Sequence, residues 1–187
     1  MSEAEAPKDR TGRLLIASPS LVDPNFHRAV VLMLEHSEEG GLGVVLNRPT
    51  PLLAREALPE AIAERMAEGE YVYQGGPVQP EAVIVLADFE DPAQAASIAF
   101  AQVGVLDPDA GVENVAPVRA IRAYGGYAGW GDRQLEGEID QEAWIDAPCT
   151  TDDVFTDDPD GLWSRVLDRK GGHYRLVARM PDDPSMN

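Results

Sequence analysis

The chain has 187 residues, of which 44% are apolar and 26% are charged, and its formal net charge is −18. This composition suits a water-soluble protein, and no apolar run approaches the roughly 18 residues that a membrane span needs. Affinity for nucleic acid comes mostly from Lys and Arg on phosphate, so the charge argues against direct DNA contact. One cysteine, Cys149, and a polar N-terminus without an apolar signal segment indicate the cytoplasm. We expect a frayed tail at residues 1–12 and a single domain at residues 13–187.

Apolar runs bounded by Gly, Pro and Asp predict short strands along the whole chain. The expected strands are Leu14–Ala17, Ala29–Leu34, Leu42–Leu46, Tyr71–Tyr73, Ala82–Ala87, Ile98–Leu106, Val118–Tyr124 and Tyr174–Met180. The unbroken run Ala29–Leu34 predicts burial on both faces, and the turn at Glu38–Gly41 predicts an antiparallel hairpin. The last strand is predicted from the alternation of apolar and basic residues.

Three helices are expected between these strands. The first begins at Pro59 and runs to Gly69. The second is capped by Asp132 and has Leu135 and Ile139 on its inner face, and the third is capped by Asp158 and ends before Gly171-Gly172. Strands occur both in hairpins and between helices, without regular alternation. The pattern therefore predicts an α+β fold with a mixed, largely antiparallel sheet curled toward a barrel and flanked by helices.

Acidic residues are concentrated in one part of the chain. Between Asp132 and Asp160 there are eleven Asp and Glu residues and one basic residue, Arg133. Such a run is either a solvated face or a docking surface for a partner with a basic surface, and the sequence leaves both open.

The motifs of common enzymes and cofactor sites do not occur in the sequence. No serine has the Gly-x-Ser-x-Gly neighbours of a nucleophile elbow. His27 and His36 flank a predicted strand and would lie about 30 Å apart if it is straight, so they cannot share a metal ion. The glycine-rich stretch Gly125–Gly131 lacks the residues of a phosphate-binding loop. It either packs aromatic residues at a bend or forms one wall of a cleft. We predict no metal and no cofactor.

Six motifs, in order along the chain, resemble the YqgE/AlgH family of bacterial proteins. They are Leu15–Pro19 with Asp23–Arg28, Glu35-His36, Gly43–Pro49, Gly75–Val78, Gly126–Trp130 with Gln134–Glu136, and Met180–Ser185. The resemblance spans nearly the whole chain. It implies a bacterial cytoplasmic protein with a helix-flanked, barrel-like α+β fold, no established biochemical activity and a link to transcriptional regulation.

Polar motif residues at the ends of apolar strands predict a binding cleft. The candidate residues are Asp23, Arg28, His36, Asn47, Arg48, Gly75, Gly76, Tyr127, Gly129, Trp130 and Gln134. Turn geometry is the competing explanation for Asp23 and Asn47. The leading hypothesis is a non-enzymatic regulatory or adaptor protein that binds a protein segment or a small ligand. The alternatives are a hydrolase with His36 or His27 as general base, and an indirect transcriptional regulator without DNA contact.

Overall fold

The computed structural model describes residues 8–109 and 116–183. Its strands are β1 (Arg13–Ala17), β2 (Val30–Ser37), β3 (Gly40–Val45), β4 (Pro49–Leu53), β5 (Tyr71–Gln74), β6 (Val78–Phe89), β7 (Ser97–Phe100), β8 (Val103–Leu106), β9 (Val118–Trp130) and β10 (Trp144–Pro148). Its helices are α1 (Ala54–Ala57), α2 (Glu60–Ala63), the 3-10 turn η1 (Pro92–Gln94), α3 (Gln134–Asp140), α4 (Thr151–Val154), α5 (Leu162–Lys170) and α6 (Tyr174–Val177). No helix of the described ranges is long and apolar enough to cross a membrane.

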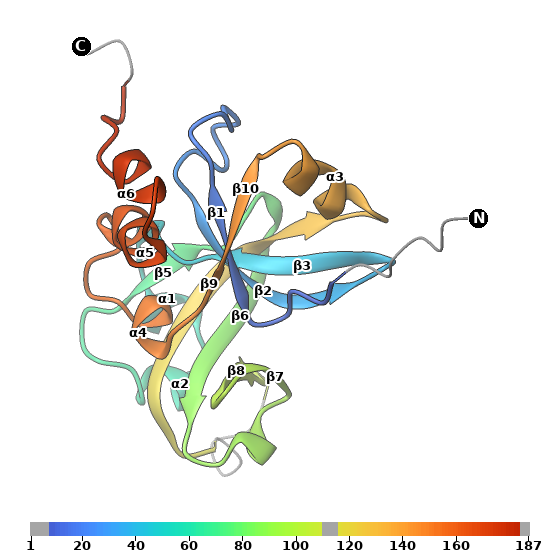
Figure 1. The fold of residues 1–187 in the computed structure, drawn as a ribbon. Coiled ribbons are helices and arrows are strands. Elements are labelled where there is room, and N and C mark those ends of the chain that lie inside the picture. Colours follow the sequence, from blue (N-terminus) through green and yellow to red (C-terminus); the bar gives the residue numbers. More distant parts are fainter. Residues whose placement is uncertain (1–7, 110–115, 184–187) are drawn as a thin grey trace.

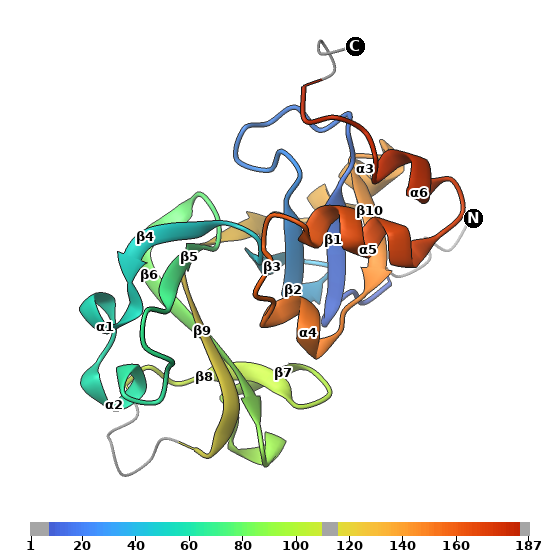
Figure 2. The ribbon, with the colours of Figure 1, turned by 90° about the vertical axis from the view of Figure 1, so that its left-hand side faces the viewer.

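The described strands join into one sheet of order β10-β1-β2-β3-β9-β6-β8-β7, with β4 and β5 beside this path. All neighbouring strands are antiparallel except β5 and β9, which pair in parallel at Tyr73 and Tyr124. The long strand β9 serves two halves of the molecule, since Ala128–Trp130 pair with β3 and Val118–Tyr127 pair with β6. Figure 2 shows β1, β2, β3 and β10 with α3 to α6 on one side, and β4 to β8 with α1 and α2 on the other.

Alternate residues of β1 and β2 point into two different cores. Leu14, Ile16 and Leu32 pack in a cluster that includes Trp163 of α5. Leu15, Val31 and Met33 face the opposite way and pack in a cluster that includes Leu135 of α3. The unbroken apolar runs of these strands follow from this arrangement, because both faces of the sheet are covered here. A third cluster packs α1 and α2 against β5, β6 and β9.

The α+β class and the largely antiparallel sheet are confirmed, but the expected curling toward a barrel is wrong. The sheet is open, and among the described strands β10 and β7 are its two ends and do not pair with each other. Strand β7 instead comes close to the start of β1, where a Cβ on Gly12 would overlap the Ala99 carbonyl. A barrel would need β7 to lie alongside β10 with a full ladder of hydrogen bonds.

The expected final strand at Tyr174–Met180 is also wrong, because Tyr174–Val177 form the helix α6 (Figure 1). Alternation fits a strand over this stretch, but Tyr174, Val177 and Ala178 are three and four residues apart. At this helical spacing all three pack on the cluster that contains α5. Leu176, which would share a face with Tyr174 in a strand, instead points outward with 72% of its surface accessible.

The expected strand Ile98–Leu106 is two strands, β7 and β8, and the sequence did not predict β4, β10, α1 or α4. The remaining differences concern where elements begin and end. The glycine-rich stretch belongs to β9 up to Trp130, and Ala128–Trp130 pair with Gly43, Leu42 and Gly41 of β3. Helix α3 begins at Gln134 after a left-handed Arg133, and Asp132 does not cap it. Helix α5 begins at Leu162; Asp158 accepts a hydrogen bond from the Gly161 amide one turn earlier. Helix α2 is a single turn, because the chain folds back after Ala63 to enter β5.

The tail expected at residues 1–12 is described only from residue 8 onward, and residues 1–7 lie outside the described ranges. Two residues of this stretch bond to β2. The Gly12 amide donates to the Met33 carbonyl at 2.8 Å, and the Arg10 amide donates to Nδ1 of His36 at 3.2 Å. The chain from Arg10 onward therefore contributes to the fold.

Two pairs of glycines cross where the two halves of the molecule meet. The Gly75 amide donates to the Gly125 carbonyl at 2.9 Å, and the Val45 amide donates to the Gly75 carbonyl at 2.8 Å. A Cβ on Gly75 would overlap the Gly126 carbonyl, and one on Gly76 would overlap the Tyr127 carbonyl. Gly126 has a φ of 71°, which other residues adopt only with strain. The crossing thus requires glycine for backbone approach as well as for turn geometry.

We expect Gly76→Ala to lower the free energy of unfolding by about 3 kcal/mol, because the added methyl group meets backbone that cannot move aside. Gly137→Ala is the matched control, since nothing lies within 4 Å of a Cβ there. Its position in α3 predicts a gain of up to about 1 kcal/mol. Urea titration followed by circular dichroism measures both changes. Equal stability of the two variants would contradict the close approach at Gly76.

Candidate functional site

The eleven residues predicted as one cleft lie in three parts of the structure. Asp23, Arg28, Asn47 and Arg48 lie around the loop between β1 and β2. Gly75, Gly76 and Tyr127 form the glycine crossing. His36, Gly129, Trp130 and Gln134 lie at the far end of β2 and β9, next to α3. The first group is the one that borders a hollow with exposed apolar side chains.

Polar side chains of the first group hold the loop between β1 and β2. The Asn47 side chain accepts from the Val30 amide at 3.0 Å and donates to the Arg28 carbonyl at 2.9 Å. Arg48 donates to the carbonyls of Pro24 and His27 at 3.2 and 2.8 Å. Because these bonds go to the protein's own backbone, Asn47 and Arg48 shape the loop.

Arg28 connects this loop to the segment after α6. It has a left-handed backbone with a φ of 53°, and its guanidinium carbon lies 4.5 Å from the centre of the Trp163 ring. Its Nε lies 2.8 Å from the Asp182 carboxylate, and its NH2 group donates to the Met180 carbonyl. Beneath it the Trp163 indole is anchored by a 2.9 Å bond from Nε1 to the Ala17 carbonyl. The arginine is therefore placed on a rigid aromatic base.

Two adjoining hollows meet at this point, and we call them together the Trp163 groove. One has a volume of about 260 Å³ and is lined by Ser18, Pro19, Val22, His27, Arg28, Trp163, Met180, Pro181 and Asp182. The other, of about 620 Å³, shares Ser18, Pro19 and Met180 with it and continues past Trp144 to His173 and Tyr174. In Figure 2 the red segment that follows α6 passes beside the blue loop between β1 and β2.

The rim of the groove exposes two apolar side chains that border the same hollow. Val22 is 86% exposed and Met180 is 42% exposed. Adjacent exposed apolar groups beside a cation are typical of a binding surface. Trp163, Met180 and Asp182 were missing from the predicted site. The closing motif Met180–Ser185 was the sequence signal for two of them, whereas Trp163 looked like an ordinary core residue of a helix.

The third group is built around the carboxylate of Glu138 in α3. Its Oε2 accepts from the indole Nε1 of Trp130 at 2.9 Å and of Trp144 at 2.7 Å, and its Oε1 accepts from Gln134 at 2.9 Å. Both tryptophans are more than nine-tenths buried, and their rings meet edge to face at 5.9 Å. This cluster attaches α3 to the sheet.

His36 lies behind this cluster and is closed off from solvent, since its side chain is 1% exposed. Its Nδ1 accepts from the Arg10 amide, and its Nε2 lies 3.0 Å from Oε1 of Glu136. With both ring nitrogens facing protein groups, His36 is not available as a general base in this conformation. His27 is half exposed, and its Nε2 lies 3.6 Å from the Asp182 carboxylate.

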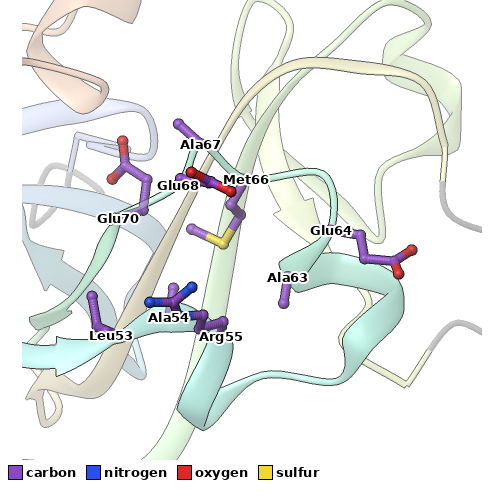
Figure 3. A pocket seen from close by; sticks show the side chains of 10 residues that line it. Leu53, Ala54, Arg55, Ala63, Glu64, Met66, Ala67, Glu68 and Glu70 are labelled. Carbon is purple, nitrogen blue, oxygen red and sulfur yellow. The ribbon is translucent and has the colours of Figure 1, made fainter.

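Two further hollows are open and polar. One of about 320 Å³ lies over the turn between β2 and β3, beside Trp130. The other, of about 450 Å³, lies between the end of β4 and the link from α2 to β5 (Figure 3). Glu64, Glu68 and Glu70 line it together with Arg55. Among the described residues, no three His, Cys, Asp or Glu side chains gather closely enough to hold a metal ion.

Many carboxylates of the acidic run Asp132–Asp160 are occupied within the protein. Asp146 pairs with Arg13, Asp158 with Arg165, and Asp153 with Arg169. Glu136 and Glu138 face the histidine and the tryptophans described above. The run therefore does not form one continuous free face, and its exposed carboxylates include Asp140, Asp152 and Asp160.

Comparison with known proteins identifies the family. A family model described as AlgH-like matches residues 14–175. The chain belongs to the AlgH-like family. It is 46% identical to a UPF0301 protein of Streptomyces coelicolor, covering 95% of each chain, and 43% identical to one of Thermobifida fusca, covering 98% of this chain and all of that one.

Two solved structures share the fold. The crystal structure of protein DIP2367 from Corynebacterium diphtheriae has a TM-score of 0.83 at 26% identity, with 93% of this chain and 94% of that chain covered. The solution structure of the AlgH protein from Pseudomonas aeruginosa has a TM-score of 0.67 at 28% identity, with 97% and 98% covered. The family thus extends across distantly related bacteria, as the six motifs suggested.

We expect Glu138→Ala to lower the free energy of unfolding by about 2–5 kcal/mol, because two buried indole donors lose their acceptor at about 1–3 kcal/mol each. Tryptophan fluorescence should shift to longer wavelength as α3 loosens from the sheet. Asp140→Ala, an exposed change in the same helix, should stay within about 0.5 kcal/mol of the wild type. Urea titration of both variants is the measurement, and a Glu138→Ala protein as stable as Asp140→Ala would contradict the shared-acceptor role.

The ion pair between buried Asp153 and exposed Arg169 predicts a pH dependence. Burial raises the pKa of Asp153, but hydrogen bonds from Arg169 and Thr150 outweigh this effect and hold the pKa below its ordinary value of 3.8. The ionised carboxylate therefore contributes stability above pH 3.8, and this contribution is lost as pH falls through the lower folded value. We expect Asp153→Asn to lose about 2 kcal/mol at neutral pH, the usual contribution of hydrogen bonds to a charged group, and less in acid. Thermal melts across pH, with exposed Asp152→Asn as control, test this; parallel pH profiles for the two variants would refute it.

Proposed function

We propose that this protein is a non-enzymatic regulatory or adaptor protein that acts by binding a protein segment in the Trp163 groove. The observation that carries the proposal is the exposed apolar rim at Val22 and Met180 beside Arg28, above a buried tryptophan. An apolar contact with a charged group at its edge is the usual composition of an interface centre. The shape of the groove, two joined hollows between a loop and a helix, suits an extended segment better than a compact ligand.

Supporting features concern rigidity and place of action. The base of the groove is held by buried bonds, such as Trp163 to Ala17 and Ser164 to the Ala178 carbonyl at 2.9 Å. A rigid base lowers the entropy cost of binding. The single cysteine agrees with action in the cytoplasm, and the net charge of −18 favours an influence on transcription through a protein partner over DNA contact. A partner with a basic surface would instead meet exposed carboxylates such as Asp140 and Asp152, outside the groove.

A hydrolase remains the second candidate because Ser18, His27 and Asp182 line the same hollow. Ser18 Oγ, however, forms its 2.7 Å hydrogen bond with Ser20 Oγ, and the Asp182 carboxylate also pairs with Arg28. A catalytic triad would need the imidazole to bond both the serine and the carboxylate. Hydrolysis of a panel of esters and peptides that disappears in both Ser18→Ala and His27→Ala would favour this candidate over the adaptor.

We expect Val22→Glu to abolish specific retention of a companion protein when the tagged chain is purified from its native cytosol, because a carboxylate on the rim opposes the apolar contact. The matched control is Leu52→Glu, which makes the same change at a 44% exposed leucine of β4 that does not line the groove. Mass spectrometry identifies the retained proteins in each case.

Two results would count against the proposal. One is that a companion is retained equally by the Val22→Glu and Leu52→Glu proteins, which would locate the interface elsewhere. The other is that the wild type retains no companion although circular dichroism shows that the tagged protein is folded. The histidine-dependent hydrolysis assay would then be the next step.

A further inference from the structure

One wall of the Trp163 groove is a segment of the chain itself, Met180–Asp182. Met180, Pro181 and Asp182 all line the smaller hollow, facing Trp163 and the loop between β1 and β2. Arg28 contacts this segment at two points, since it donates to the Met180 carbonyl and pairs with the Asp182 carboxylate. His27 approaches the same carboxylate at 3.6 Å. The segment therefore contributes a carbonyl and a carboxylate, and the rest of the groove contributes the Arg28 guanidinium, the His27 imidazole and the Trp163 ring.

These contacts define the chemistry that the groove recognises. The apolar side chain of Met180 lies at the rim, and the backbone carbonyl of Met180 accepts a hydrogen bond from the Arg28 guanidinium. Two residues later, the carboxylate of Asp182 pairs with the same guanidinium. A proline between them restrains the backbone to an extended form and offers no amide that would need a partner. Arg28 is a positive group in a chain of net charge −18, so a carboxylate is the complementary ligand.

The segment is held more loosely than the helix that precedes it. Up to Met180 the backbone is fixed by turns, with the Met180 amide bonded to the Val177 carbonyl at 3.0 Å. Beyond it the side chain of Asp182 is 78% exposed, and ion pairs that face solvent contribute little. Met180 itself is 42% exposed. Arg28 and His27, which contact Asp182, lie in the loop between β1 and β2, so these contacts can break without unfolding α5 or α6.

We propose that Met180–Asp182 is a displaceable strap that occupies the site of a partner's acidic, proline-containing segment of the same pattern, apolar residue, proline, aspartate. This inference rests on the proposed function and adds the chemical class of the partner to it. The strap competes with the partner from within the chain, at the high effective concentration of a short tether. The groove therefore binds in trans only a segment that matches or improves on these contacts.

The test uses the full chain and a fluorescent peptide with the sequence of residues 178–183. Fluorescence anisotropy measures the affinity of this peptide for the wild type and for two variants. Asp182→Ala weakens the attachment of the strap, and Arg28→Ala removes the guanidinium that binds it. We expect Asp182→Ala to bind the peptide about five-fold more tightly than the wild type, the effect of one exposed ion pair. Arg28→Ala should lose binding. A peptide carrying alanine in place of its first aspartate should also lose binding to Asp182→Ala.

Two controls test the inference even if the Arg28→Ala protein is poorly folded. Asp140→Ala makes the same charge change outside the groove and should bind the peptide as the wild type does. The alanine peptide needs no change in the protein, so it tests the carboxylate contact on its own. The inference is overturned if Asp182→Ala and the wild type bind equally, if no protein binds the peptide, or if the alanine peptide binds as well. It is also overturned if the strap exchanges between two copies, which sedimentation would detect as a dimer.

The two proposals fail in different ways. Loss of a companion in Val22→Glu together with no peptide binding would leave the groove as an interface for a segment of other chemistry. Retention of the companion in Val22→Glu would remove the groove as the interface.

Discussion

The glycine crossing between Gly75-Gly76 and Gly125-Gly126 is the constraint on which the rest of the fold depends. It lets the backbone of the link between β5 and β6 lie against the backbone of β9, and it joins the end of β3 to both. Because β9 passes through this point, one strand can pair with β3 in one half of the molecule and with β6 in the other. A side chain at the crossing would separate the halves, and the loop and helices that form the Trp163 groove would lose the sheet that supports them.

The sequence predicted best the elements whose residues are dictated by burial on two faces. The runs around Leu14–Ala17 and Ala29–Leu34 became β1 and β2 because both faces of these strands pack in cores. Strand β9 was predicted too short, since glycines usually end strands and only pairing with β3 explains them here. The stretch from Tyr174 to Met180 satisfied both strand and helix spacing, and contact with α5 decided between them. Such choices depend on tertiary neighbours that a local pattern does not contain.

The predicted site shows the same limit. Asn47 and Arg48 are explained by the backbone groups they hold, and His36 and Trp130 by the buried contacts around α3. Among the predicted residues only Arg28 lines the Trp163 groove. The groove brings together residues 18–28, 163 and 180–182, which are far apart in the chain, and no spacing rule connects them. The chemistry of the groove follows from the position of Arg28 above the Trp163 ring and beside the Asp182 carboxylate, which only the folded structure brings together.

The position of β9 in the chain also determines how the protein can be made. Its two partner strands, β3 and β6, are synthesised first. The edges of these strands that pair with β9 have no partner until Val118–Trp130 leave the ribosome. Unpaired edges of this kind are prone to aggregate, and pairing between residues about ninety positions apart, such as Gly41 with Trp130, slows folding. Neither half can complete its part of the sheet before β9 has been made, so the nascent chain is a natural client for chaperones until that point.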